Sequence, residues 1–150
     1  MNFLSLSFKK TSKDFLSSNK KFKLKVNLKK MSDNIPQEKL YDLQIIHQMC
    51  RGNHDQVEKM VAVFIIEVSK TIGDIESALS EKDFSRIKNL AHKVKPTLNY
   101  FGTVSLEKEV IEVESLLSKD FNINELQSKI ATISDISKKV VDQLKSHFNL

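Results

Sequence analysis

The sequence predicts an all-α fold: an antiparallel up-down four-helix bundle, preceded by a short extra N-terminal helix and a disordered basic tail. Only three Gly and two Pro occur in 150 residues, and such sparse breakers favour long helices over many short strands. Four long segments carry apolar residues at the spacing of three and four that is typical of helices. Short turn-like segments join them, and short connections make neighbouring helices antiparallel.

Charge divides the chain into two parts. Residues 1–30 hold nine Lys and a single acidic residue, Asp14, whereas the whole chain has a formal charge of +5, which leaves a net −3 for the remainder. We therefore predict a basic, disordered tail over residues 1–34 and one bundle domain over residues 35–150. Because the positive excess belongs to the tail, we expect no nucleic-acid binding by the folded domain.

The short extra helix is predicted over residues 38–50. Gly52 is expected to lie just past its end, and Asn53 is expected to cap the next helix, with Gln56 completing a pattern like a capping box. Its apolar stripe comprises Leu40, Leu43, Ile46 and Met49.

The first long helix is predicted from about residue 54 to residue 80. Gly73 should soften it by about 1 kcal/mol relative to Ala without breaking it. Residues 81–83 form a short connection, in which Asp83 is the next N-cap. The apolar positions of this helix are Val57, Met60, Val61, Phe64, Ile65, Val68, Ile72, Ile75 and Leu79.

The second long helix spans residues 84–102 and ends at Gly102. Pro96 lies in its interior and should bend it, because proline clashes with the carbonyl four residues back, that of His92, which is freed. The apolar sector comprises Phe84, Ile87, Leu90, Ala91, Val94, Leu98 and Phe101.

Two further helices complete the predicted bundle. Thr103 or Ser105 is expected to cap the first of them, and residues 119–124 make the turn to the last. The first carries Leu106, Val110, Val113 and Leu117 inward, and the last carries Leu126, Ile130, Ile133, Ile136, Val140, Leu144 and Phe148.

His92 does not share the apolar sector of its helix. It lies about 140° from Ile87 around the helix axis, in a polar sector. Lys88 comes one turn before it and Lys95 almost one turn after it, so both ammonium groups can lie near the imidazole. Neutral imidazole is a nucleophile near neutral pH, and lysines can balance the charge of phosphate oxygens. The arrangement therefore suits a phosphoryl-accepting histidine, and the competing interpretation is a common surface histidine on a solvated helix face.

Metal binding and membrane insertion are weaker interpretations. His47, Cys50 and His54 fall within eight residues, but Gly52 should break the helix between them and no fourth ligand follows at a zinc-like spacing. We predict no metal and no cofactor. Cys50 is the only cysteine, and no apolar run approaches the roughly 18 residues of a membrane span, so we expect a cytoplasmic protein.

The residues resemble the histidine-containing phosphotransfer (HPt) domains of bacterial multistep phosphorelays. In that family a histidine helix reading roughly A-H-x-L-K-G-S is followed by a Gly, an apolar residue and a Leu-Glu pair at fixed distances. An upstream Gly-Asp/Asn turn and a phenylalanine precede it, and the resemblance covers residues 38–118. Here the matching residues are Arg51, Gly52, Asn53, Phe64, Ala91, His92, Val94, Lys95, Gly102, Leu106, Val113 and Glu114.

The resemblance implies that His92 accepts a phosphoryl group on Nε2 from the aspartyl phosphate of a receiver domain and passes it to another receiver. It also implies that Lys95, with help from Lys88, balances phosphate charge and that Glu114 holds the Nδ1–H of His92. Pro96 replaces the family's usual Gly, a small residue that lets a receiver domain approach closely. The substitution therefore bears on the docking geometry. Mg²⁺ would belong to the receiver partner, because this face of the chain has no acidic cluster.

We predict a carrier that is not itself an enzyme, because the sequence has neither a GxxxxGK[ST] loop nor the kinase motifs. We expect it to be a monomer. Two other functions stay open: a helical adaptor that binds a signalling partner without phosphoryl transfer, and a nucleic-acid-binding protein that acts through residues 9–30.

Overall fold

Every regular element within residues 36–150, the part of the chain that the computed structural model describes, is a helix. The all-α prediction is therefore confirmed. Residues Lys39–Leu150 form one compact unit. The predicted tail, residues 1–34, lies outside the described residues, and the predicted domain boundary at residue 35 stays a prediction.

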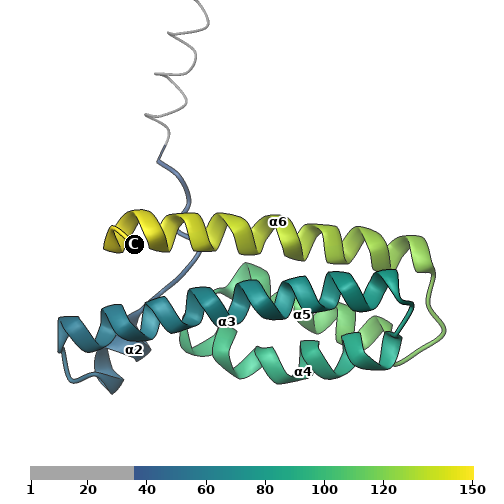
Figure 1. The fold of residues 1–150 in the computed structure, drawn as a ribbon, viewed down its shortest axis with the longest axis horizontal. Helices are drawn as coiled ribbons and strands as arrows, with labels where there is room; N and C mark the ends of the chain where they lie inside the picture. The colour runs from purple at the N-terminus through teal and green to yellow at the C-terminus, as the bar shows by residue number, and fades with distance from the viewer. Residues whose placement is uncertain (1–35) are drawn as a thin grey trace, which may run out of the picture. The chain divides into compact units, whose positions relative to one another are not determined.

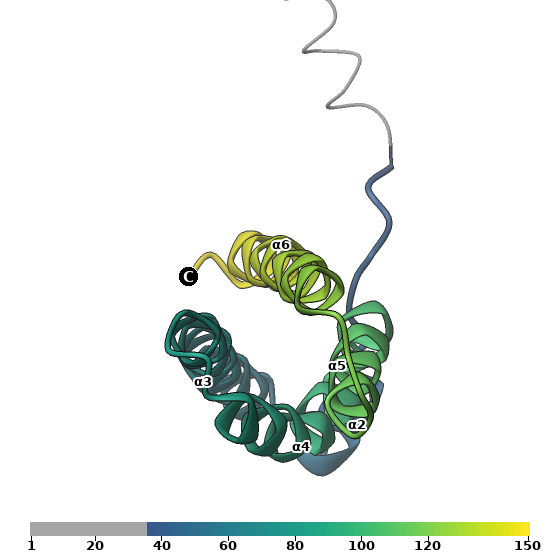
Figure 2. The same ribbon diagram turned by 90° about the vertical axis from the view of Figure 1, so that its right-hand side faces the viewer.

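Four long helices build the bundle: α3 (His54–Ser80), α4 (Phe84–Tyr100), α5 (Val104–Leu116) and α6 (Ile123–Phe148). Consecutive helices run in alternating directions (Figure 1). Viewed along the bundle, α3, α4, α5 and α6 surround a common core, and each packs against its two neighbours (Figure 2). The short α2 (Gln44–Met49) packs against α3.

The predicted caps explain where α3 and α4 begin. The side chain of Asn53 accepts a hydrogen bond from the Gln56 amide (3.2 Å), and Asp83 does the same for Arg86 (3.0 Å). The start of α5 differs from the prediction. Thr103 occupies the N-cap position, but its buried hydroxyl donates to the Leu98 carbonyl (3.0 Å), and Ser105 lies inside the helix. Neither hydroxyl therefore caps α5.

The extra helix is much shorter than predicted. It begins at Gln44 instead of residue 38, because backbone groups before it bond to other parts of the bundle. The Leu40 amide donates to the side chain of Gln143 (2.9 Å), and the Asp42 amide donates to the Phe101 carbonyl (3.0 Å). Residues 39–43 are thus held against the bundle by tertiary hydrogen bonds, and Met49 of the predicted stripe is 57% exposed.

The turns after α2 and after α4 each contain a glycine with positive φ. Arg51 (φ +51°) and Gly52 (φ +75°) follow α2, so the left-handed C′ position belongs to Arg51 and the predicted Gly52 comes one residue later. Gly102 (φ +61°) follows α4, with the Thr103 amide bonded to the Leu98 carbonyl at 3.1 Å. This pattern satisfies the last carbonyls of α4 and turns the chain into α5.

The core contains the apolar residues that the helical spacing placed inward, with a few exceptions. Phe64 and Phe101 stack at its centre, with ring centroids 4.1 Å apart. Met60, Leu79, Phe84, Leu90, Leu117, Ile136 and Phe148 are only partly buried. On α6, Ser134 and Ser137 are buried instead of Ile136. The helix therefore faces α3 partly with small polar residues.

Two predictions concerned breaks within helices. Helix α3 continues through Gly73 without interruption. Helix α4 also continues through Pro96, up to Tyr100. Because proline has no N–H, the His92 carbonyl lacks its helical donor there. The bend at Pro96 stays a prediction.

Candidate functional site

His92 lies on the seam between α4 and α5. Its neighbour Ala91 is fully buried, and so is Val113, which precedes Glu114 on α5. These two buried residues fix how each helix is rotated about its axis, and consequently Glu114 comes within reach of His92. The His92 side chain is 73% exposed, so the predicted outward position of the imidazole is observed.

Glu114 contacts two residues of α4. Its Oε1 lies 2.7 Å from Nδ1 of His92, and its Oε2 pairs with the ammonium of Lys95. The carboxylate is largely shielded from solvent, with 19% of the side chain exposed, and Lys95 is 27% exposed. The structure thus brings together three of the four predicted site residues, from two adjacent helices.

The charge state of Glu114 determines which nitrogen of His92 carries the proton. Hydrogen bonds from Lys95, and to a lesser degree from His92, hold the pKa of Glu114 below its ordinary value, although burial acts in the opposite direction. Glu114 is therefore ionised at neutral pH and accepts hydrogen bonds only. The 2.7 Å contact then requires the proton to be on Nδ1 of His92. In the neutral ring, this leaves the exposed Nε2 with a free lone pair.

Lys88 is the fourth predicted residue. It is exposed one turn before His92 on α4, and its ammonium makes no ion pair with any residue in the range 36–150. Sequence reasoning named all four residues but assigned Lys95 to an incoming phosphate. The structure shows Lys95 paired with Glu114, and its role toward a phosphate stays a prediction. No sequence signal could reveal this pair, because Lys95 and Glu114 lie 19 positions apart on different helices.

The three residues considered for metal binding are not arranged as ligands. Cys50 is buried with its Sγ 3.3 Å from the sulfur of Met60, and the ring of His54 lies near Phe148. Within residues 36–150, no group of three or more His, Cys, Asp or Glu side chains is placed to hold a metal ion. In the same range, no helix is long and apolar enough to cross a membrane.

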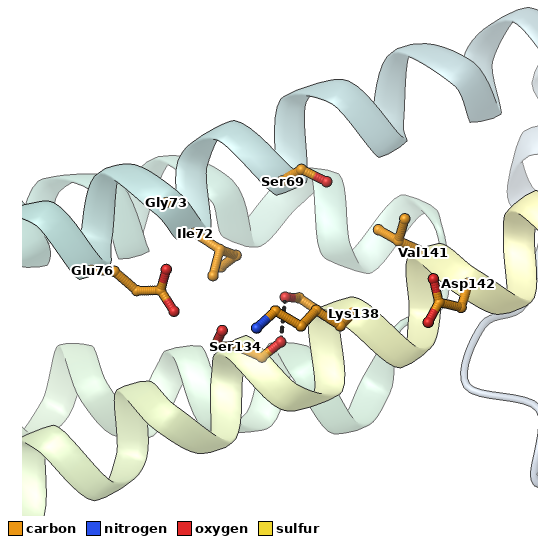
Figure 3. Close-up of a pocket in the computed structure, with 9 residues that line it drawn as sticks. Ser69, Ile72, Gly73, Glu76, Ser134, Lys138, Val141 and Asp142 are labelled. Atoms are coloured by element: carbon orange, nitrogen blue, oxygen red, sulfur yellow. Dashed lines mark hydrogen bonds between the residues drawn. The ribbon is translucent and has the colours of Figure 1, made fainter.

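A hollow of about 230 Å³ lies between α3 and α6, away from the His92 seam. It exists because Gly73 on α3 faces Ser134 and Ser137 on α6, and these small residues leave the space unfilled. Glu76 and Lys138 extend toward each other across it from opposite helices (Figure 3). The hollow holds none of the residues that the sequence analysis singled out for function.

Comparison with known proteins defines the class. Residues 59–147 match the Hpt domain family, which is more than half of the chain, so the chain belongs to this family. Hpt domains are the histidine phosphotransfer modules of phosphorelays, and membership supports that general role for this chain. Among curated proteins, no sequence matches this chain.

Two solved structures share the fold. One is the HPT domain from an Hpt sensor hybrid histidine kinase of Shewanella, with a TM-score of 0.60, 18% identity, and coverage of 72% of this chain and 92% of that chain. The other is histidine-containing phosphotransfer protein B (HptB) from Pseudomonas aeruginosa PAO1, with a TM-score of 0.63, 17% identity, and coverage of 75% and 96%. At these identities the likeness concerns the fold.

Proposed function

We propose that this chain is a phosphorelay carrier in which Nε2 of His92 accepts a phosphoryl group from the aspartyl phosphate of one receiver domain and passes it to the aspartate of another. One observation carries the proposal. The imidazole is exposed to solvent, and the largely shielded carboxylate of Glu114 lies 2.7 Å from its Nδ1, so that Nε2 is left as the nucleophile.

The transfer step follows from this arrangement. The Nε2 lone pair attacks the phosphorus, a P–N bond forms, and the P–O bond to the donor aspartate breaks, which returns that carboxylate to the receiver. The proton on Nδ1 stays in place throughout. The ring becomes positively charged as the bond forms, and the Glu114 carboxylate stabilises that charge. In the reverse sense, a receiver aspartate attacks the same phosphorus and His92 leaves as neutral imidazole.

The receiver supplies the metal ion in this proposal, and the chain supplies the nucleophile and its hydrogen-bonding partner. The chain is a carrier and not a kinase, because it performs one half-reaction with each partner. Since receiver domains act in the cytoplasm, the proposed partners also place the protein there.

The proposal is tested with receiver domains charged by radiolabelled acetyl phosphate. We expect the full chain to take up label that is acid-labile and base-stable, and to lose it when an uncharged second receiver is added. His92→Gln should take up none. His47→Gln is the matched control, because His47 is also an exposed helix histidine, and it should be labelled like the unchanged chain.

A different result would favour the adaptor interpretation. If His92→Gln is labelled as well as the unchanged chain, the acceptor is another residue and the proposal is wrong. If the chain binds receivers with equal affinity before and after the substitution but is never labelled, it acts by binding alone.

A further inference from the structure

The carboxylate of Glu114 is shared between two α4 side chains that differ in what they can do. One oxygen meets the exposed imidazole of His92, and the other meets the ammonium of Lys95, which is only 27% exposed. A carboxylate held at one oxygen alone is free to rotate about its terminal torsion, which is broad and shallow. Held at both oxygens, it presents a fixed lone-pair direction to Nδ1.

We propose that Lys95 is a positioning residue that acts on His92 through Glu114, and that it is not the cation that meets the incoming phosphoryl group. Lys95 lies three residues after His92 on α4, on the side that faces α5. Its ammonium is already paired with a carboxylate, so its charge is largely neutralised before any phosphate arrives.

Ionisation supports the same assignment. The hydrogen bond from Lys95 is the strongest influence that lowers the pKa of Glu114, ahead of the one from His92. Without the Lys95 ammonium, the pKa of the shielded Glu114 carboxyl would rise, and the ionised form, which only accepts hydrogen bonds and so keeps the proton on Nδ1 of His92, would be less strongly favoured. Lys95 would therefore act on phosphoryl transfer by favouring one tautomer and one orientation of the His92 ring.

Lys88 takes the other role. It is exposed one turn before His92 and makes no ion pair within the described part of the chain, so its positive charge is uncommitted. Residues four apart on a helix share a face, which places this ammonium near the phosphoryl oxygens once Nε2 is modified. These roles of Lys88 and Lys95 rest on the proposed function, but the effect of Lys95 on the His92 ring does not require phosphotransfer.

The test is nitrogen-15 NMR of the imidazole rings in the unphosphorylated full chain, at a pH where histidine is neutral. We expect the His92 ring of the unchanged chain to carry its proton on Nδ1. In Lys95→Met, the fraction of rings with the proton on Nδ1 should fall, because Glu114 is then held at one oxygen only. Lys95→Arg should restore Nδ1–H, because a guanidinium can also hold the carboxylate. Lys88→Met should leave the tautomer as it is.

The phosphotransfer rates of the same variants complete the test. If Lys95→Met keeps the proton on Nδ1 and yet accepts phosphoryl groups more slowly, Lys95 acts on the phosphate directly and the inference is wrong. If neither the unchanged chain nor any variant accepts a phosphoryl group, the proposed function is wrong. The tautomer measurement still decides the role of Lys95 in that case. Circular dichroism of each variant checks that the bundle is intact.

Discussion

Replacing Gly102 by alanine is expected to lower the free energy of unfolding by about 2–4 kcal/mol, from backbone strain and a clash that cannot relax. Gly102 has φ +61°, and a Cβ there would lie 2.6 Å from both Cβ and the carbonyl oxygen of Asp42. The Asp42 backbone cannot easily move away, because its amide is bonded to the Phe101 carbonyl at 3.0 Å. Chemical denaturation of the variant and the unchanged chain measures the difference.

The chain offers two matched glycine controls. Gly52 also has a positive φ (+75°) but nothing lies within 4 Å of an added Cβ, so Gly52→Ala should cost only about 1 kcal/mol of strain. Gly73 lies inside α3 with open space around it, so Gly73→Ala should stabilise the chain by up to about 1 kcal/mol. If Gly102→Ala costs no more than Gly52→Ala, the close approach of residues 39–43 to the bundle is wrong.

Replacing Phe64 by alanine is expected to cost about 3–5 kcal/mol in the free energy of unfolding, the usual range for removing a buried aromatic ring. Phe64 is 1% exposed and stacks on Phe101, with an angle of 22° between the rings. Thermal or urea unfolding provides the measurement. Val63→Ala is the control on the same helix, because Val63 is 59% exposed and its loss should change stability by less than about 0.5 kcal/mol.

A double-mutant cycle makes this test sharper. The stacked pair should show a coupling of about 0.5–1.5 kcal/mol between Phe64→Ala and Phe101→Ala beyond their separate effects. Additive effects would mean that the two rings pack independently.

The sequence predicted the long helices well because their apolar periodicity is a local property. Ile87, Ala91, Val94 and Leu98 share one face of any helix, and that face is buried in the structure. The capping residues Asn53 and Asp83 act within a few residues of their own position, so they could also be read from the chain.

The errors have tertiary causes. The amide of Asp42 bonds to a carbonyl 59 residues away, and no local pattern distinguishes residues 38–43 from the start of a helix. Likewise, Ser134 and Ser137 are buried where α6 packs on α3 near Gly73, whereas spacing alone assigned an inward position to Ile136.

The candidate site was predictable in part. Helical geometry alone placed His92 outward with Lys88 and Lys95 near it, since all three lie on one helix. Glu114 lies on the next helix, and only the family resemblance suggested its contact with Nδ1. The pairing of Glu114 with Lys95 depends on how α4 and α5 pack side by side, which the three-dimensional structure provides.

The central claim is that Nε2 of His92 is the atom that accepts the phosphoryl group, because Nδ1 carries a proton that is hydrogen-bonded to Glu114. The most direct measurement is phosphorus–nitrogen coupling in an NMR spectrum of the nitrogen-15-labelled chain after it has been charged by a phosphorylated receiver. We predict a coupling to Nε2 of His92 alone, with the proton still on Nδ1. A coupling to Nδ1 of His92, or to any other histidine, would contradict the account.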